Sequence, residues 1–266
     1  MHFSVIVVHF NAPQQLQNCL GSIPHNVEVI VVDNASTDDP KQELANAHPG
    51  TIWLRNEHNI GYGAAMNQGV NASTKKQILL LNQDIILAAN AMEELAQDIG
   101  TNGEYGIWGA QLQSENGKAQ GVAGPFPSLF AWLVRFLLPR SKRKYYRKKP
   151  EPCTPVDWIT GAFMSMPRAT FEKLQGFDDE FFMYYEDTDL CKRAAERNIG
   201  VSISKAKATH STPMAERTSI PVTLAQSIRY SQLHYFKKHR PNWEYHSLLM
   251  ITRIYFAIKQ WGWRTE

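Results

Sequence analysis

The first hundred residues alternate between short apolar runs and segments with helical spacing, and this alternation constrains the fold more than any other feature. The apolar runs do not alternate with polar residues, as expected for strands covered on both faces. Strands that alternate with helices form right-handed βαβ units and a parallel sheet. We therefore predict strands over 3–9, 27–32, 51–54 and 78–81, and helices over 16–23, 40–47, 61–72 and 89–99.

The alternation weakens from residue 101 onward. There we expect short strands near 106–112 and 155–166, a helix over 187–198, and a helical tail from about 222 to 263 that is rich in aromatic and basic residues. The predicted fold is α/β, and its first half, residues 1–100, is of the nucleotide-binding type.

Size and composition are those of a soluble globular protein, with 266 residues of which 43% are hydrophobic and 20% charged. The three cysteines lack the spacing of metal ligands and indicate a reducing compartment. The sequence starts directly with a predicted strand instead of a signal peptide, and no apolar run reaches the ~18 residues that span a bilayer. We therefore expect a cytoplasmic protein.

A polar triplet, Asn82-Gln83-Asp84, ends the fourth predicted strand. In open α/β sheets, ligands bind at the carboxyl ends of the strands. Residues two apart after a strand can point the same way, so Asn82 and Asp84 are candidate ligands of a divalent cation. Mg²⁺ and Mn²⁺ prefer oxygen ligands and commonly bridge to phosphates. The alternative is a turn with capping polar residues.

A second acidic cluster, Glu186-Asp187-Thr188-Asp189, opens a predicted helix, where the helix dipole favours carboxylates. The dipole does not explain the aromatic residues that precede the cluster, which are expected to build a sugar-binding wall: Phe177, Phe181, Phe182, Tyr184 and Tyr185. A carboxylate walled by aromatic rings suits a general base.

Several other positions have both a structural and a functional interpretation. Asp33 ends the second strand and suits either a nucleoside contact or a helix cap. The turn from Asn59 to Gly63 suits either an anion, through its backbone N–H groups, or a loop that needs positive φ. Asn67 follows in the first turns of the next helix. His210 gains a role only if it completes a metal site with Asp84.

Six motifs, taken in order, resemble the family 2 glycosyltransferases, and most of all the branch with rhamnosyltransferases of bacterial surface polysaccharides such as lipopolysaccharide O-antigen. The resemblance covers roughly residues 3–215. The motifs are Val-Val-x-Phe-Asn near the start, Val-Val-Asp-Asn-Ala-Ser-Thr-Asp, Asn-x-Gly-Tyr-Gly-x-x-x-Asn, Leu-Leu-Leu-Asn-Gln-Asp, Trp-Ile-Thr-Gly-Ala, and Gly-Phe-Asp-x-x-Phe-Phe-Met-Tyr-Tyr-Glu-Asp-x-Asp-Leu.

The resemblance implies a GT-A fold (a Rossmann-like mixed sheet flanked by helices), a nucleotide-sugar donor, Mg²⁺ or Mn²⁺, and inversion at the anomeric carbon. It implies a catalytic domain over 1–215, with its acceptor half over 101–215, and a helical extension over 216–266. By position, the residues that the resemblance implies for donor binding are Asn11, Asp33, Asn59, Gly61, Asn67 and Asn82. It further implies Asp84 and His210 at the metal, Asp187 with Glu186 in catalysis, and Trp158, Gly161 and Tyr185 on the acceptor side.

One departure from the general Asp-x-Asp motif is Asn82, although Asn-x-Asp is common in the rhamnosyltransferase-like branch. A neutral amide binds a cation less strongly than a carboxylate, so we expect modest metal affinity. The branch favours dTDP-rhamnose as the donor, but no residue in the sequence identifies the sugar or the base.

The basic charge of the chain is local. Residues 140–149 hold seven of the 28 basic residues and no acid, so the other 21 face all 25 acidic residues and the rest of the chain is near −4. The apolar stretch 126–139 precedes this run, and the pair suits docking at an anionic membrane surface, with a lipid-linked glycan as acceptor at the inner face of the membrane. The alternatives are a buried helix and a solvated loop for segment 126–150, and core packing or a homodimer contact for the tail.

Three other functions fit the sequence less well. A nucleotidyltransferase would show a Gly-rich loop with a basic residue after the first strand, but His9-Phe10-Asn11-Ala12-Pro13 stands there. A non-catalytic carbohydrate- or nucleotide-sugar-binding protein is favoured only by Asn82 and opposed by the intact Glu186-Asp187 pair. Nucleic-acid binding lacks a recognition module beside the basic run.

Overall fold

The computed structural model describes residues 2–37, 44, 47–102, 106–137, 151–211 and 222–262. The basic run 140–149 lies outside these residues, and so does almost all of the predicted helix over 40–47. The strands are β1 (Phe3–His9), β2 (Glu28–Asp33), β3 (Ile52–Arg55), β4 (Gln77–Asn82), β5 (Ile85–Leu87), β6 (Ile107–Gln113), β7 (Ala123–Gly124), β8 (Trp158–Ile159), β9 (Phe163–Pro167) and β10 (Val201–His210). The helices are α1 (Pro13–Ser22), α3 (Tyr62–Ala72), α4 (Ala91–Asn102), α5 (Leu129–Leu137), α7 (Arg168–Lys173), α8 (Glu186–Glu196), α9 (Val222–His239) and α10 (Asn242–Gly262).

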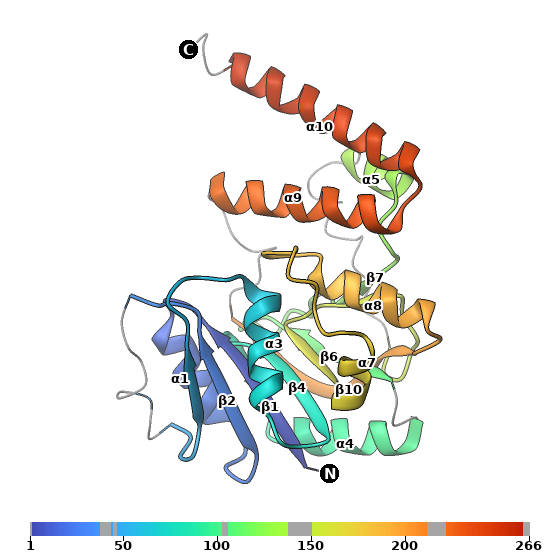
Figure 1. Cartoon of the computed structure of the whole chain (residues 1–266). Helices are drawn as coiled ribbons and strands as arrows, with labels where there is room; N and C mark the ends of the chain where they lie inside the picture. The colour runs from blue at the N-terminus through green and yellow to red at the C-terminus, as the bar shows by residue number, and fades with distance from the viewer. Residues whose placement is uncertain are drawn as a thin grey trace.

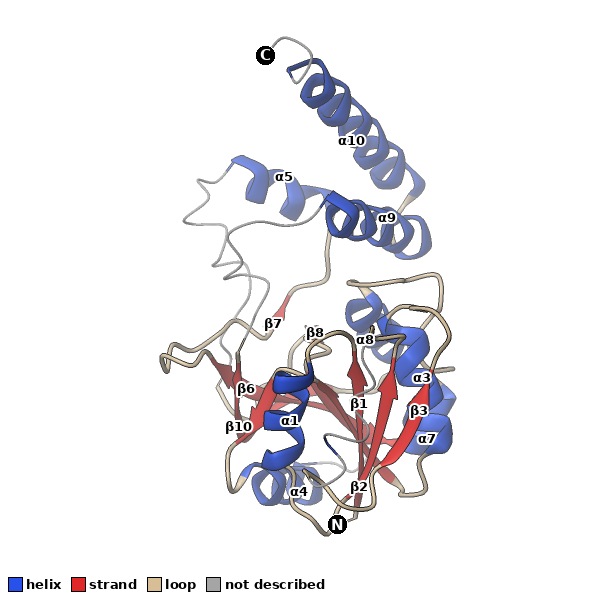
Figure 2. Ribbon diagram, turned by 90° about the vertical axis from the view of Figure 1, so that its left-hand side faces the viewer, coloured by secondary structure: helices blue, strands red, loops and turns tan. Residues whose placement is uncertain are grey.

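Eight strands form one mixed sheet in the order β3-β2-β1-β4-β9-β6-β10-β5. The four strands β1 to β4 pair in parallel, as predicted. The second half adds antiparallel pairs, because β9 runs against both β4 and β6, and β5 runs against β10. The α/β prediction is confirmed, with helix α3 on one face of the sheet and α1 and α4 on the other (Figures 1 and 2).

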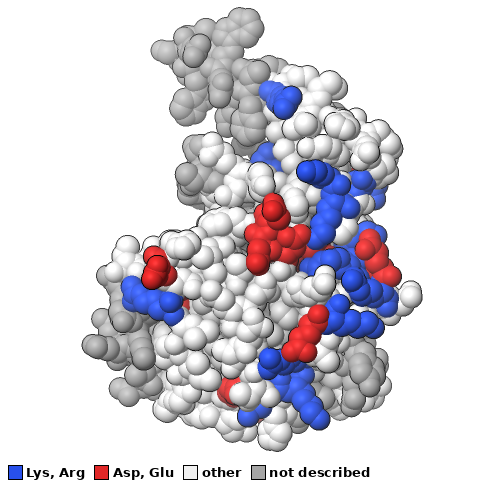
Figure 3. Space-filling view, in the orientation of Figure 1, with Lys and Arg blue, Asp and Glu red and all other residues white. Residues whose placement is uncertain are grey.

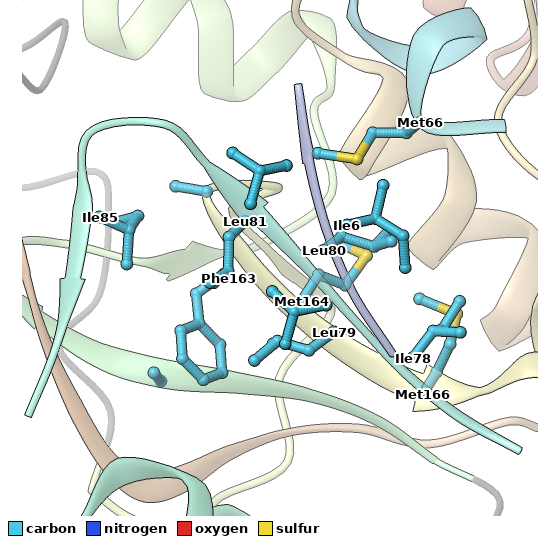
Figure 4. Packing of buried hydrophobic residues seen from close by; sticks show 14 of the residues in the cluster. Ile6, Met66, Ile78, Leu79, Leu80, Leu81, Ile85, Phe163, Met164 and Met166 are labelled. Atoms are coloured by element: carbon cyan, nitrogen blue, oxygen red, sulfur yellow. The ribbon is translucent and has the colours of Figure 1, made fainter. Parts of the chain in front are cut away.

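The main core lies between the sheet and its helices. Strand β4 is buried from Gln77 to Leu81, and its leucines pack against β1, β9 and α3 (Figure 4). Such burial on both faces explains why the strand sequence is apolar throughout. Glycine is required at Gly69 on α3, since a Cβ there would lie 2.3 Å from Ile6 Cγ2 on β1. The helix therefore packs directly on the parallel strands.

The tail forms two helices, whereas the sequence analysis predicted one helical segment. Helix α9 ends at His239 and α10 begins at Asn242, with Pro241 between them. Proline lacks the N–H that a continuous helix needs and disfavours helical geometry in the residue before it. The chain therefore turns there, and α10 leads away from the sheet (Figure 1).

A second hydrophobic cluster joins the tail to the rest of the molecule. It contains Leu129 of α5, Phe181, Tyr235 and Phe236 of α9, and Leu248 of α10. Glu244 of α10 accepts a hydrogen bond from the Leu129 N–H at 2.8 Å. One side of α5, α9 and α10 is thus packed internally.

Candidate active site

Two predicted site residues, Asp33 and Asn82, lie at one edge of the sheet together with His9. His9, Asp33 and Asn82 are the last residues of β1, β2 and β4, and His9 is paired with Asp33 in the register. Because these strands are parallel neighbours, their carboxyl ends meet, which is where open α/β sheets bind ligands. The sheet thus brings the end of β2 and the Asn82–Asp84 triplet together.

Asp84 and His210 come together although they are far apart in the chain. Strand β5 begins right after Asp84 and pairs with β10 so that His210 lies opposite Ile85. His210 Nε2 is 3.3 Å from Asp84 Oδ2, and the Ser211 N–H donates to the Asp84 carbonyl oxygen at 3.0 Å. The short strand β5, which the sequence analysis did not predict, creates this contact.

Gln120 fixes the tautomer of His210. Its amide Nε2 donates to the His210 carbonyl oxygen at 3.3 Å, so its oxygen faces His210 Nδ1, 3.2 Å away. A carbonyl oxygen only accepts, so Nδ1 carries the proton. In a neutral ring, Nε2 then faces the Asp84 carboxylate with its lone pair, and these two acceptors need a proton or a cation between them. Such an outer hydrogen bond is typical of metal-binding histidines.

The donor set fits a divalent cation that is shared with a ligand. Among the described residues, no group of three or more histidine, cysteine or acidic side chains is placed to hold a metal ion. Asp84 and His210 would supply two ligands, and the remainder would come from phosphate oxygens and water. Mg²⁺ sites in phosphate-binding proteins commonly combine one or two carboxylates with phosphate oxygens and water.

Asp187 lies in the first turn of α8 with its carboxylate held by three donors. Oδ2 accepts from the Gly161 N–H at 2.9 Å. Oδ1 accepts from the N–H of Thr188 at 2.7 Å and from its hydroxyl at 3.1 Å. The two residues before the helix, Tyr184 and Tyr185, both have left-handed backbones, with φ of 67° and 70°. Non-glycine residues in this region cost ~1–3 kcal/mol each and cluster at functional sites.

Tyr62 connects the two halves of the site. Its hydroxyl donates to the Gly161 carbonyl oxygen at 2.8 Å. Burial, and then the charges of Glu186, Asp187 and Asp84, raise the pKa of Tyr62 well above its usual value. The Asn82 N–H donates to the Ala162 carbonyl oxygen at 3.0 Å, and Gly161, the residue before Ala162, donates to Asp187, so the Asn82–Asp84 triplet and Asp187 lie in the same region of the molecule.

The environment distinguishes Glu186 from its neighbour Asp187. Glu186 is buried, and its Oε2 has no hydrogen-bond partner among the described residues. Burial, and then the charge of Asp187, raise the pKa of Glu186 well above its ordinary value. A carboxyl group that holds its proton is a poor base, so the pair favours Asp187 for proton removal.

Both interpretations of Asp33 remain open. Oδ1 accepts from the Ser36 N–H at 2.9 Å, which is a capping-type turn, while Oδ2 lies 3.4 Å from Arg55 Nη1. Asn11 lies beside this turn, because its Oδ1 accepts from the Thr37 N–H at 2.8 Å. The predicted donor-side roles of Asp33 and Asn11 stay predictions.

Amide side chains occupy the Asn59–Gly61 turn. The N–H of Ile60 donates to Asn34 Oδ1, that of Gly61 to Asn59 Oδ1, and that of Tyr62 to the Phe182 carbonyl oxygen. These N–H groups are used within the protein, so they do not form the anion cradle that we considered. Gly61 has φ of 91°, and a Cβ there would lie 2.6 Å from the Phe182 oxygen. The turn therefore needs glycine for its conformation.

Asn67 holds a turn instead of facing the donor side. Its Nδ2 donates to the Phe177 carbonyl oxygen and to Asp179 Oδ1, both at 2.9 Å, and its Oδ1 accepts from the Phe177 N–H. Both ends of the amide are thus committed, and the donor-binding prediction for Asn67 is wrong. The sequence around Asn67 does not indicate whether its amide contacts the donor or a distant backbone turn.

The aromatic wall is only partly as predicted. Phe177 and Phe181 are buried in the two hydrophobic clusters, whereas Phe182 is 40% exposed. Tyr185 faces α9, where its hydroxyl accepts from Gln232 Nε2 at 3.0 Å. The prediction fails for Phe177 and Phe181, because their rings fill the core.

The predicted acceptor-side residues occupy different surroundings. Gly161 contacts Asp187 directly, as described above. The Trp158 indole Nε1–H donates to the Pro125 carbonyl oxygen at 2.9 Å, and its ring packs against Gly124. The acceptor roles of Trp158, Gly161 and Tyr185 stay predictions.

Asp189, the last acid of the cluster, contacts basic side chains of two helices. It is fully buried and lies within 2.8 Å of Arg193, Lys238 and His239. Burial alone would raise the pKa of Asp189, but the hydrogen bond from His239 and the charges of Arg193 and Lys238 outweigh it and lower the pKa to about 2. Helix α9 is thereby fastened to the helix that carries Asp187, and Figure 3 shows acidic and basic side chains side by side near this contact.

Sequence analysis missed two further residues of the site. Gln83, the middle of the triplet, clamps the end of β1: its Oε1 accepts from the Phe10 N–H at 3.1 Å and lies 2.6 Å from His9 Nδ1. Phe10 itself is 41% exposed at the same edge as Asp33. Phe10 could have been identified from the sequence, because an aromatic residue directly after the first predicted strand lies where ligands bind.

Comparison with known proteins identifies relatives along most of the chain. A sequence profile described as glycosyl transferase family 2 matches residues 4–175, and one described as the N-terminal domain of galactosyltransferase matches residues 143–217. Rhamnosyltransferase WbbL of Escherichia coli (strain K12) is 37% identical over 206 residues, which cover 73% of this chain and 76% of WbbL. The N-acetylglucosaminyl-diphospho-decaprenol L-rhamnosyltransferase of Mycobacterium tuberculosis (strain ATCC 25618 / H37Rv) is 26% identical, covering 77% of this chain and 75% of that protein.

Solved structures show the same fold. GalNAc-T7 with UDP, GalNAc and Mn²⁺ has a TM-score of 0.61 at 16% identity, covering 88% of this chain. This chain spans about half of that one, with 48% covered. Residues 1–349 of S. aureus TarS in complex with UDP-GlcNAc have a TM-score of 0.56 at 18% identity, covering 94% of this chain and 70% of that one. These likenesses confirm the predicted GT-A fold.

Proposed function

Because this chain belongs to glycosyl transferase family 2, we propose that it moves a sugar from a nucleotide donor to an acceptor hydroxyl with inversion at the anomeric carbon. The observation that supports this most is the pairing around Gly161: its N–H donates to Asp187 Oδ2 at 2.9 Å, and the next residue, Ala162, accepts from the N–H of Asn82, two residues before Asp84, at 3.0 Å. Inverting transfer needs a group that stabilises the departing diphosphate and a base that faces the incoming alcohol. Asp84 and Asp187 provide these two functions close together.

The donor occupies the carboxyl edge of the sheet in this proposal. Asp33 and Asn11 contact the nucleoside, and Asn82 and Asp84 lie toward the diphosphate. A divalent cation, Mg²⁺ or Mn²⁺, held by Asp84 and His210 would neutralise charge on the leaving diphosphate. The second half of the chain presents the acceptor, near Gly161 and Trp158.

Asp187 is the general base of the proposal. Its carboxylate takes the proton of the acceptor hydroxyl while that oxygen attacks the anomeric carbon from the face opposite the diphosphate. The bond between the anomeric carbon and the diphosphate oxygen breaks, and its electron pair leaves with the nucleoside diphosphate. The acceptor proton ends on Asp187. Glu186, whose pKa is raised by burial and then by the charge of Asp187, is less suited to this role.

The best candidate donor is dTDP-rhamnose, and this choice rests on the relatives. Two of them are named rhamnosyltransferases, one of which has a decaprenol-linked diphosphosugar in its name. We therefore propose a glycan or lipid-linked glycan as acceptor. We also propose that residues 1–215 form the catalytic domain, and that the extension over 216–266 supports it through the contact between α9 and α8.

A panel of nucleotide sugars tests the proposed function. We expect dTDP-rhamnose to raise the melting temperature more than UDP-GlcNAc or UDP-GalNAc, and only with Mn²⁺ or Mg²⁺ present, because a ligand that binds the folded state alone stabilises it. We further expect metal-dependent release of the nucleoside diphosphate with a polyprenyl-diphosphate-linked sugar as acceptor. Saturable donor binding without turnover on any acceptor would instead favour the non-catalytic sugar-binding alternative.

A membrane surface is the proposed location of the acceptor. Among the helices that the structure describes, none is long and apolar enough to cross a bilayer. Away from the internal cluster, α5 and α10 expose apolar side chains, among them Phe130 at 77%, Trp243 at 64% and Met250 at 59%. The seven basic residues of 140–149 follow α5 in the sequence. Apolar side chains beside a basic run are complementary to anionic lipid headgroups.

Co-sedimentation with vesicles tests this location. We expect binding to vesicles that contain phosphatidylglycerol, little binding to pure phosphatidylcholine, and weaker binding at high salt, since surface charges are screened. The double variant Phe130→Ser, Leu133→Ser should bind less. Ile52→Ser, which changes an exposed apolar residue on β3, is the matched control. Equal binding to both lipids, or none to either, would refute membrane docking.

A further inference from the structure

We propose that Tyr62 is a positioning residue for the base, acting through the backbone of Gly161. The inference rests on the proposed function, because it assigns Tyr62 to the reaction in which Asp187 removes a proton. Tyr62 was not among the candidate residues identified from the sequence. It lies at the first position of α3, next to the Gly61 turn.

Gly161 is held from both sides. The Tyr62 hydroxyl donates to its carbonyl oxygen at 2.8 Å, and its own N–H donates to Asp187 Oδ2 at 2.9 Å. A Cβ built on Gly161 would lie 3.4 Å from Asp187 Cβ and 3.6 Å from Tyr62 Cε1. The Gly161 backbone thus lies in contact with both the tyrosine ring and the carboxylate. A shift of this backbone would release one of the three donors that orient Asp187.

Tyr62 can act as an anchor because it is itself fixed. Its N–H donates to the Phe182 carbonyl oxygen at 2.9 Å, and its ring lies 6.2 Å from that of Phe177, centroid to centroid. The preceding residue, Gly61, accepts a hydrogen bond from the Asn34 amide at its carbonyl oxygen, 3.1 Å away. Asn34 directly follows Asp33 at the end of β2. One chain of contacts therefore connects the proposed nucleoside side to the base.

The tyrosine is not suited to proton transfer itself. Its hydroxyl proton is directed at the Gly161 carbonyl oxygen, and the surrounding carboxylates oppose formation of a phenolate. The role that remains is geometric. Displacing a catalytic group by about 1 Å can cost ~10²-fold in rate, so a rigid support for Asp187 has a measurable effect.

The test is Tyr62→Phe, which keeps the ring and removes the hydroxyl. We expect kcat to fall about 10- to 100-fold while KM for the donor is unchanged, because only the alignment of the base is lost. Tyr235→Phe is the matched control: it removes another buried tyrosine hydroxyl, one that has no hydrogen-bond partner among the described residues. An unchanged kcat in Tyr62→Phe, or an equal loss in the control, would overturn the proposal.

A double-mutant cycle distinguishes action through Asp187 from an independent role. In the Asp187→Asn background we expect Tyr62→Phe to cause no further loss, because the base that it positions is gone. Additive losses in the double variant would show that Tyr62 acts elsewhere, and they would refute the positioning role.

An exchange measurement keeps the proposal testable without turnover. The Gly161 amide is protected by its bond to Asp187, so Tyr62→Phe should speed hydrogen exchange at this amide, as Asp187→Ala should, while Tyr235→Phe should not. Unchanged exchange in Tyr62→Phe would refute the inference. A wild-type protein without transferase activity would instead refute the proposed function, and the exchange data would still decide the role of Tyr62.

Discussion

Replacing Asp187 by Asn is expected to lower the rate of sugar transfer by about 10²- to 10⁴-fold, the usual cost of losing a general base. The amide keeps the size of the side chain and can still accept from the Gly161 N–H through its oxygen. It cannot take the proton of the acceptor hydroxyl. Donor binding should survive, because Asp187 lies on α8 and not at the ends of the strands that receive the nucleotide.

The rate is measured as nucleoside diphosphate released at saturating donor and acceptor, and donor binding is measured by thermal shift. Glu172→Gln is the control, since it removes one negative charge from an exposed side chain on α7 that pairs with Arg168. Glu186→Gln should cost less than Asp187→Asn, because Glu186 already holds its proton. Wild-type activity in Asp187→Asn would remove this residue from the role of base.

Replacing Asp84 by Asn is expected to lower transfer by about 10²- to 10³-fold, similar to the loss of one group that stabilises developing negative charge. The carboxylate is the only acid of the Asn82–Asp84 triplet, so a neutral amide there weakens binding of a cation. The stabilisation that Mn²⁺ adds in the presence of a nucleotide sugar should also disappear. Thermal shifts with and without Mn²⁺, before and after chelation with EDTA, measure this directly.

His210→Ala should have a smaller effect than Asp84→Asn, because the carboxylate charge remains. His25→Ala is the matched control, since His25 is exposed, lies before β2 and packs its ring beside that of His48. A metal-dependent thermal shift that persists in Asp84→Asn would place the cation elsewhere. An EDTA-insensitive wild-type rate would show that the reaction needs no divalent cation.

The first half of the fold could be predicted because its elements are local. The runs over β1, β2 and β4 are apolar throughout and end in polar residues, and helix α3 follows a Gly-rich turn, so neighbouring residues alone indicate each element. Strand β5 was missed because it has only three residues, Ile85–Leu87, too few for a periodic pattern. The break at Pro241 shows the same limit, since a proline within a helical pattern leaves open whether the helix bends or ends.

The site was predictable as a set of residue types and less so as a set of roles. Asp84, Asp187 and His210 stand out by their place after strands or at the start of a helix. Asn67 and Asn34 are equally polar, yet their amides satisfy backbone groups of distant turns. The partner of Asn67 is 110 residues away and that of Asn34 is 26 residues away, and neither leaves a trace in the local sequence.

What the sequence by itself determined is the order of β1 to β4 with helices α1 and α3, the family, and the acids just after β4 and in the first turn of α8, since these follow from short-range patterns. The tertiary structure alone decided which groups meet: His210 with Asp84 through β5 and β10, Tyr62 with Asp187 through Gly161, and Asp189 with the end of α9. The physical reason is that a carboxylate takes its function from the charges and donors around it, and sheet pairing and helix packing bring those partners from distant parts of the chain.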